Sequence, residues 1–199
     1  MKLVLASKNE DKIKEIKSLL QDLNLDILTF KDFESFPDTI EDKSTLEGNA
    51  EKKSRAIWKK FHLPALADDT GLFVDALNGK PGVYSSRFAG ENVTYKQNRQ
   101  RLLFVLKDIP KEKRTAAFKT VIVFIDKEGS KFVVNGECKG YIGFKEKGDN
   151  GFGYDSIFYY DNSNKTFAEL SSDKKNKISH RGIALRKIGS IIEENIKNI

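Results

Sequence analysis

Apolar residues in the first third of the chain form short continuous runs that alternate with segments of helical spacing. Residues 3–6 (Leu-Val-Leu-Ala) are a run typical of a buried strand. A helix is predicted to follow from about Asn9, because apolar residues then recur every three or four positions, at Ile13, Ile16, Leu19, Leu20 and Leu23. The same reasoning predicts further strands at 25–30, 63–67 and 157–160, and further helices at 44–61, 93–107 and 183–199.

The middle of the chain has a different pattern. Residues 115–126 and 131–141 are long and apolar, and the turn-forming residues 127–130 separate them, which predicts a hairpin. The first of these strands shows little alternation, so we expect burial on both faces. Residues 76–91 are rich in Gly, Asn, Pro and Ser and are predicted to form a long ordered loop. Helices and strands that alternate around a hairpin indicate an α/β fold with a mixed sheet.

Composition narrows the class of protein. The 199 residues carry a net charge of +6, with 39% hydrophobic and 32% charged residues, as in an ordinary folded domain. No apolar run approaches the ~18–20 residues of a membrane span, and the apolar start is too short for a signal peptide, so we expect a cytoplasmic protein. One cysteine, Cys138, and two histidines exclude a disulfide framework and a Cys- or His-based metal cage. Interleaved lysines and acids favour a solvated surface over a nucleic-acid groove.

Two segments near the N-terminus carry candidate chemistry. Residues 7–12 (Ser-Lys-Asn-Glu-Asp-Lys) lie between a predicted strand and a predicted helix, where free backbone N–H groups bind phosphate. The same residues also suit a capped helix start with solvated lysines. Asp68 and Asp69 follow an apolar run, at the expected carboxyl end of a strand, which suits either Mg²⁺ or a turn. Because neighbouring strand residues point to opposite faces, we expect only one of these aspartates to face a site.

Two later segments add to these. Residues 151–155 (Gly-Phe-Gly-Tyr-Asp) combine glycines that allow close backbone approach with aromatic rings that can stack on a base, although a glycine bulge beside core aromatics is the alternative. Lys175, His180 and Arg181 near a predicted helix start suit phosphate or base oxygens, or form only a basic first turn. Together the four segments contain the parts of a nucleoside triphosphate site.

In this order along the chain, the segments resemble those of the inosine triphosphate pyrophosphatases, and the resemblance covers essentially the whole sequence. Five motifs carry it: residues 6–9 with Lys12 and Glu15, residues 67–72 (Ala-Asp-Asp-Thr-Gly-Leu), residues 81–88 (Pro-Gly-Val-Tyr-Ser-Ser-Arg-Phe), residues 151–155, and residues 178–182 (Ile-Ser-His-Arg-Gly).

The resemblance implies magnesium-dependent hydrolysis of ITP, dITP and XTP to the nucleoside monophosphate and pyrophosphate, which removes deaminated purines from the nucleotide pool. It implies a single domain over residues 1–199, with a long mixed sheet flanked by helices in two lobes and the active site in a central cleft. A homodimer is also implied. The expected partner is a purine nucleoside triphosphate, with neither nucleic acid nor membrane.

The resemblance also implies roles for individual residues. Asp69 is expected to be the proton acceptor and a Mg²⁺ ligand, and Glu41 a second metal carboxylate. Residues 7–12 would bind the triphosphate and residues 152–155 the base. The expected substrate-binding residues are Ser7, Lys8, Asn9, Glu10, Asp11, Lys12, Lys53, Thr70, Phe152, Gly153, Tyr154, Asp155, Lys175, His180 and Arg181.

Two positions depart from the family pattern. Gly48 stands where many members have a glutamate, and Ser156 replaces a proline that often follows the Gly-Phe-Gly-Tyr-Asp motif. The residues themselves leave three other functions open: a pyrophosphatase for modified pyrimidine or ordinary nucleotides, a nucleic-acid-binding module, and a nucleotide sensor without turnover.

Overall fold

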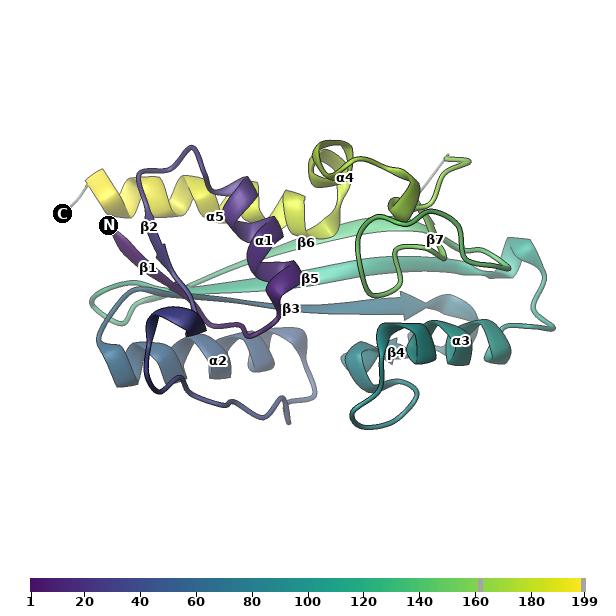
Figure 1. Cartoon of the computed structure of the whole chain (residues 1–199), viewed down its shortest axis with the longest axis horizontal. Helices are drawn as coiled ribbons and strands as arrows, with labels where there is room; N and C mark the ends of the chain where they lie inside the picture. The colour runs from purple at the N-terminus through teal and green to yellow at the C-terminus, as the bar shows by residue number, and fades with distance from the viewer. Residues whose placement is uncertain (161–162, 198–199) are drawn as a thin grey trace. The chain divides into compact units, whose positions relative to one another are not determined.

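The computed structural model describes residues 1–160 and 163–197 (Figure 1). The chain divides into two compact units, which we call unit 1 and unit 2. Unit 1 comprises Met1–Asp69, Thr120–Gly136 and Arg181–Ile199, and unit 2 comprises Thr70–Lys119 and Glu137–His180. Three strands contribute to both units: β3 (Ala65–Val74), β5 (Thr115–Ile125) and β6 (Lys131–Ile142).

The sheet is mixed, in the strand order β2-β1-β3-β5-β6-β7, with β4 beside β3. In unit 1, β1 (Lys2–Leu5) pairs in parallel with β2 (Asp26–Leu28) and with the first half of β3. In unit 2, β4 (Pro81–Gly82) pairs antiparallel with the second half of β3, and β7 (Phe158–Tyr160) pairs antiparallel with β6. The predicted α/β class with a mixed sheet is confirmed.

Helices cover both faces of the sheet in unit 1. Figure 1 shows α1 (Glu10–Leu19) and α5 (His180–Lys197) on one face and α2 (Leu46–Phe61) on the other. The alternation of β3 explains this division, because Leu66 packs in the cluster that includes α1 and α5, whereas Ala65 and Ala67 pack in the cluster that includes α2. The face that each β3 side chain meets is therefore set by its position along the strand.

Unit 2 has its own core and shorter helices. Phe118, Phe158 and Phe167 are buried in one cluster with apolar residues of α3 (Tyr95–Val105). A second helix of this unit is α4 (Ser172–Ile178). Short 3-10 helices lie between the longer elements within each unit. In unit 1 this is η1 (Phe30–Asp32), and in unit 2 they are η2 (Asp75–Leu77), η3 (Ser85–Arg87), η4 (Lys111–Lys113) and η5 (Phe167–Glu169).

The largest departure from the sequence prediction concerns β3. We expected the strand to end before Asp68, but it continues to Val74, so the two aspartates lie inside a strand rather than at its carboxyl end. Their carboxylates are buried and paired with cations, which allows polar residues to continue a strand that hydropathy alone would end. The predicted 115–126/131–141 hairpin is confirmed by the adjacent strands β5 and β6. Burial on both faces holds for residues 122–125 of β5, whereas residues 115–121 alternate between buried and more exposed side chains.

Helix ends also differ from prediction. The first helix ends at Leu19 although Leu20 and Leu23 continue the apolar spacing, because a turn follows in which the Leu23 N–H bonds to the Leu20 carbonyl. Helix α2 begins at Leu46 rather than at residue 44, because Thr45 is its N-cap and accepts a hydrogen bond from the Gly48 N–H.

Other boundaries shift in smaller ways. The second strand is only Asp26–Leu28, because a capping box at Thr29 starts η1. The expected loop 76–91 contains β4 and η3. The last helix begins at His180 rather than residue 183, and the expected end of that helix at residues 198–199 lies outside the described residues. Lys175 occupies the last turn of α4, not a helix start, and there a cation complements the helix dipole.

Among residues 1–160 and 163–197, we find no helix with the length and hydropathy of a membrane span.

Candidate active site

Asp68, at the centre of β3, is buried among cations on the α1/α5 face of unit 1. Its carboxylate lies 3.2 Å from the Lys12 ammonium and 3.0 Å from the Arg181 guanidinium. Arg181 is 2% exposed and also pairs with Glu15 of α1. Burial alone would raise the pKa of Asp68, but Lys12 and Arg181 hold it well below its usual range. These four charges therefore form a balanced, buried network.

Asp69 points to the opposite face, toward α2. Its carboxylate accepts hydrogen bonds from the Asn49 amide and the Lys53 ammonium, each at 3.2 Å. Asn49 and Lys53 are four residues apart on α2 and so share one face of that helix. Asp68 and Asp69 therefore have separate partners on opposite faces of β3. This is consistent with the expectation that only one of the two faces a given site.

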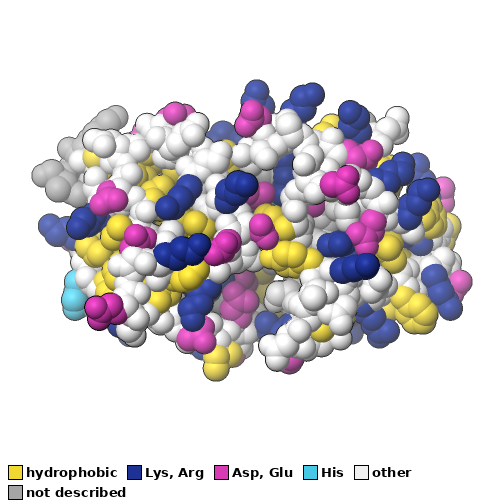
Figure 2. Space-filling model, viewed as in Figure 1, with side chains coloured by type: hydrophobic (Ala, Val, Ile, Leu, Met, Phe, Trp, Pro, Cys, Tyr) yellow, Lys and Arg dark blue, Asp and Glu magenta, His cyan; other side chains and the backbone are white. Residues whose placement is uncertain are grey.

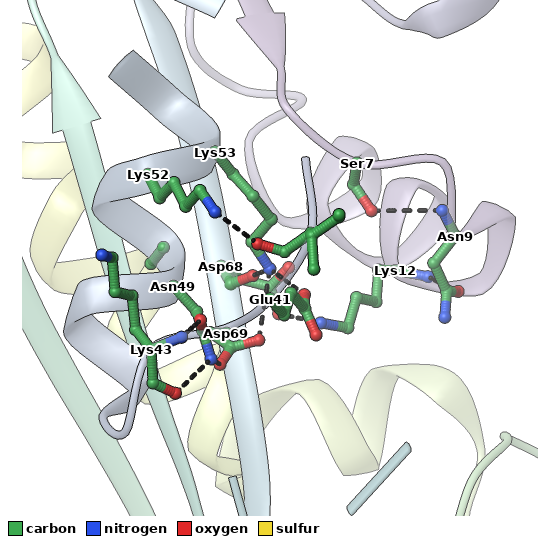
Figure 3. A network of polar contacts seen from close by, with 12 residues as sticks. Ser7, Asn9, Lys12, Glu41, Lys43, Asn49, Lys52, Lys53, Asp68 and Asp69 are labelled. Carbon is green, nitrogen blue, oxygen red and sulfur yellow. Dashed lines mark hydrogen bonds and ion pairs between the residues drawn. The ribbon is translucent and has the colours of Figure 1, made fainter. Parts of the chain in front are cut away.

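Lys53 connects Asp69 to a second carboxylate. Its ammonium donates to Glu41 at 2.7 Å, to Asp69 at 3.2 Å and to the backbone carbonyl of Asp68 at 2.7 Å (Figure 3). Burial alone would lower the pKa of Lys53, but Asp69 and Glu41 raise it above its usual value. Two carboxylates thus share one ammonium, and this group of three side chains has a net charge of −1.

The pKa values of Asp69 and Glu41 are shifted in opposite directions. The pKa of Asp69 is raised, first by burial and also by the nearby charge of Glu41. Burial would likewise raise the pKa of Glu41, but Lys53 outweighs it and lowers that pKa. A buried carboxylate with a raised pKa is a stronger base than an exposed one, so Asp69 is the better suited of the two to accept a proton.

The β1–α1 junction brings Lys12 to the aspartates of β3. The Asn9 side chain caps α1 by accepting from the Lys12 N–H at 3.1 Å, and the Ser7 hydroxyl accepts from the Asn9 N–H at 3.2 Å. The capped helix start is confirmed. It leaves the Lys12 side chain directed at Asp68, as Figure 3 shows.

The other predicted residues of this segment lie on the surface. Lys8 pairs with the exposed Asp38 at 3.0 Å, and Glu10 pairs with Lys31 at 2.7 Å. Asp11 is exposed in the first turn of α1. None of these contacts joins them to the Asp68 and Asp69 networks.

In unit 2, the Gly-Phe-Gly-Tyr-Asp segment forms a turn rather than the start of a strand. Gly151 and Gly153 have φ of 74° and 62°, which favour glycine. Asp155 accepts from the Phe152 N–H at 2.9 Å and from the Lys175 ammonium at 2.7 Å. That ammonium also lies 4.9 Å from the centre of the Phe152 ring. The structure therefore groups Phe152, Asp155 and Lys175, three of the residues predicted to bind substrate.

Other predicted residues of unit 2 are packed into its core. The Tyr154 hydroxyl donates to the Ser85 carbonyl at 2.8 Å, and burial raises the pKa of Tyr154. The His180 ring stacks on Phe118, with ring centres 4.6 Å apart. Thr70 follows Asp69 on β3 and is half-buried.

Asn49 is a site residue that sequence reasoning did not single out. A buried asparagine inside a helix is unfavourable unless its amide has a specific partner, and here it bonds to Asp69 and to the backbone of Lys43. Its spacing of four residues from Lys53 is the signal that could have identified it.

Buried lysines and carboxylates beside a helix start on a mixed α/β sheet are features of the class of proteins that bind phosphorylated ligands. The model of the Ham1 family matches residues 3–191 of this chain. The chain is 44% identical over 197 residues to a dITP/XTP pyrophosphatase of Thermoanaerobacter pseudethanolicus, with 99% of each chain covered. It is 46% identical over 192 residues to a dITP/XTP pyrophosphatase of Leuconostoc mesenteroides, with 95% of each covered.

A solved structure of a HAM1 protein from Coxiella burnetii has a TM-score of 0.88 and 40% identity, covering 98% of this chain and 99% of that one. The chain belongs to the Ham1 family, which confirms the resemblance drawn from its motifs.

Proposed function

We propose that this protein is a nucleoside-triphosphate pyrophosphatase that hydrolyses ITP, dITP and XTP to the monophosphate and pyrophosphate. Its family membership supports the reaction class, because the relatives compared above are named dITP/XTP pyrophosphatases. The observation that carries the chemistry is Asp69, a buried carboxylate with a raised pKa that is held by Asn49 and Lys53. Such a group can accept the proton of an attacking water.

Each residue of unit 1 then has a distinct task. Asp69 orients the water that attacks the α-phosphorus and takes its proton. Asn49 and Lys53 hold the carboxylate in one orientation. Lys12 and the N-terminus of α1 bind the triphosphate, and their positive charge stabilises the negative charge that develops on the leaving pyrophosphate.

The donor set also fits a divalent cation such as Mg²⁺. Glu41 and Asp69 offer hard oxygen ligands and carry more negative charge than Lys53 neutralises. In the described parts of the chain, no group of three or more His, Cys, Asp or Glu side chains could hold a metal. Two carboxylates are sufficient for Mg²⁺, which takes further ligands from water and substrate phosphates. When bound, the ion supplies Lewis-acid stabilisation of phosphate charge.

We expect Glu41→Gln to raise the Mg²⁺ concentration for half-maximal activity by about tenfold or more, since even outer contacts of metal sites change affinity by 10- to 100-fold. A magnesium titration of ITP hydrolysis measures this shift. Glu34→Gln, an exposed glutamate of the same segment, is the matched control and should behave as the parent protein. An unchanged magnesium requirement in Glu41→Gln would exclude Glu41 as a ligand.

For the base, we propose recognition of the 6-oxo group by residues of unit 2. Phe152 stacks on the purine, Asp155 accepts from ring N–H groups, and Lys175 donates to the 6-oxygen. His180, stacked on Phe118 in the core, and Arg181, paired with Asp68 and Glu15 in unit 1, are not assigned to this contact. Adenine, which has an amino group at that position, would leave a buried donor unpaired, and such mismatches give strong discrimination.

Product analysis with ITP, XTP, GTP and ATP, each with and without Mg²⁺, tests the proposed reaction. We expect monophosphate and pyrophosphate from ITP and XTP and little product from ATP. Guanine shares the 6-oxo group, so little product from GTP requires a further contact that excludes its 2-amino group. Equal turnover of all four would retain the phosphate chemistry and reject the base selection. Tight binding of ITP without turnover would instead indicate a nucleotide sensor.

We further propose that the enzyme acts on free nucleotides in the cytoplasm, as a homodimer, and that units 1 and 2 are lobes of a single domain. On the face visible in Figure 2, lysines and arginines are interspersed with acidic side chains. This mixed charge supports a free nucleotide rather than a nucleic acid as the partner, because polyanion binding favours a continuous basic surface.

A further inference from the structure

Arg99 connects helix α3 to the Gly-Phe-Gly-Tyr-Asp turn of unit 2. Its guanidinium donates from Nη1 to the Gly153 carbonyl at 2.8 Å and from Nε to the Glu146 carboxylate at 2.8 Å. The Arg99 side chain is only 17% exposed. A planar guanidinium presents its donors in a fixed geometry, so two simultaneous bonds hold the carbonyl and the carboxylate in a defined relation.

Glu146 extends this connection to the residue that follows the turn. The Ser156 hydroxyl donates to the same Glu146 oxygen at 3.1 Å, and the Ser156 carbonyl accepts from the Lys147 N–H at 2.8 Å. We call Arg99, Glu146 and Ser156 the turn brace. It contacts the turn at Gly153 and directly after its last residue.

The turn needs such restraint because of its own composition. Two of its five residues are glycines with positive φ, and glycine loses more conformational freedom on ordering than any other residue. Phe152 lies between these glycines and is half-buried, with its ring centre 5.9 Å from that of Tyr95. Tyr95 and Arg99 are four residues apart on α3, so one face of this helix meets the turn twice.

From this geometry we propose that the turn brace is a positioning device for base recognition. By holding the Gly153 carbonyl, Arg99 sets where Phe152 and Asp155 lie, and thereby how strongly the purine is bound and distinguished. This inference rests on the proposed function of the turn as the base-binding element.

The test compares Arg99→Gln with Arg101→Gln, an exposed arginine two residues further along the same helix. For Arg99→Gln we expect the KM for ITP to rise about tenfold, the scale of one lost charge-assisted hydrogen bond. The kcat should stay within about threefold, because the phosphate chemistry belongs to other residues. The ratio of kcat/KM for ITP over ATP should fall. Arg101→Gln should match the parent protein in all three.

Two further variants separate positioning from folding. Arg99→Lys retains a charge for Glu146 but not the fork that also reaches Gly153, so we expect partial recovery of KM. Ser156→Ala removes one hydrogen bond at the far end of the brace and should raise KM less than Arg99→Gln does. A variant series with lower melting temperatures but unchanged KM and base preference would overturn the proposal, as would a general loss of kcat for every nucleotide.

Binding of inosine monophosphate, measured by calorimetry, provides a readout that needs no turnover. Weaker binding by Arg99→Gln than by the parent protein supports the brace even if no triphosphate is hydrolysed, in which case only the proposed reaction fails. Equal binding by the two proteins overturns the brace, even if hydrolysis occurs as proposed. Absence of binding to the parent protein overturns base recognition by the turn, and with it the brace, whereas product analysis decides the proposed reaction separately.

Discussion

Replacing Asp69 by asparagine should lower kcat for ITP hydrolysis by at least about 10²-fold, the lower scale of a lost general base. Asparagine has nearly the same shape, but its single oxygen replaces only one of the two carboxylate oxygens that accept from Asn49 and Lys53, so the folding of unit 1 must be measured beside the rate. What it cannot do is take a proton from water. Initial rates at saturating ITP and Mg²⁺, with circular dichroism of both proteins, measure the effect.

The matched control is Asp26→Asn, an exposed aspartate on β2, which should retain full activity. A near-normal rate in Asp69→Asn would reject Asp69 as the proton acceptor.

Replacing Asp68 by asparagine should reduce the free energy of unfolding by about 3–5 kcal/mol, the usual effect of removing one partner of a buried ion pair. The reason is that Arg181, itself 2% exposed, loses a compensating charge on β3, while its pairing with Glu15 remains. Urea denaturation measures the change. Asp38→Asn, which removes an exposed partner of Lys8, should cost at most about 1 kcal/mol.

The stability difference between the parent protein and Asp68→Asn should also depend on pH. The pKa of Asp68 lies well below its unfolded value of about 3.9, so its contribution is complete above about pH 5. Below about pH 4 the unfolded state binds a proton that the folded state does not, and the contribution declines. A difference that grows toward acid, or a loss no larger than that of Asp38→Asn, would contradict the buried network as described.

The fold was predictable where apolar patterns were long and unbroken, as in the hairpin of β5 and β6. It was not predictable at β3, because burial of Asp68 and Asp69 depends on cations elsewhere in the sequence. Arg181 is 113 positions from Asp68, and no local pattern reveals that pair. Hydropathy therefore ends the strand at the first aspartate, whereas the folded chain continues it.

The candidate site was likewise predictable only in part. Resemblance identified Glu41, Lys53 and Asp69, and the structure brings these three side chains together. The resemblance did not identify the residues that hold these predicted side chains in place. Asn49 acts on a carboxylate 20 positions away, and Arg99 on a carbonyl 54 positions away. Supporting residues of this kind carry no chemical motif of their own, and only tertiary structure reveals them.

Because Asp68 and Asp69 are neighbours on one strand, the face of the sheet that each meets depends on whether its position in β3 is odd or even. Side chains alternate along β3, and its pairing with β1 aligns Ala65 with Val4 and Leu66 with Leu5. One residue inserted or deleted between this pairing and Asp68 would turn each carboxylate to the opposite face, directing the proposed proton acceptor to the α1/α5 side and the structural anion to the α2 side. Two inserted residues would restore the face but displace both carboxylates along the strand by about 6.6 Å, beyond the reach of their present partners. The buried Ala67, the one residue between the β1 pairing and Asp68, can therefore be exchanged only for a residue of similar size, and the length of the strand at this point is fixed.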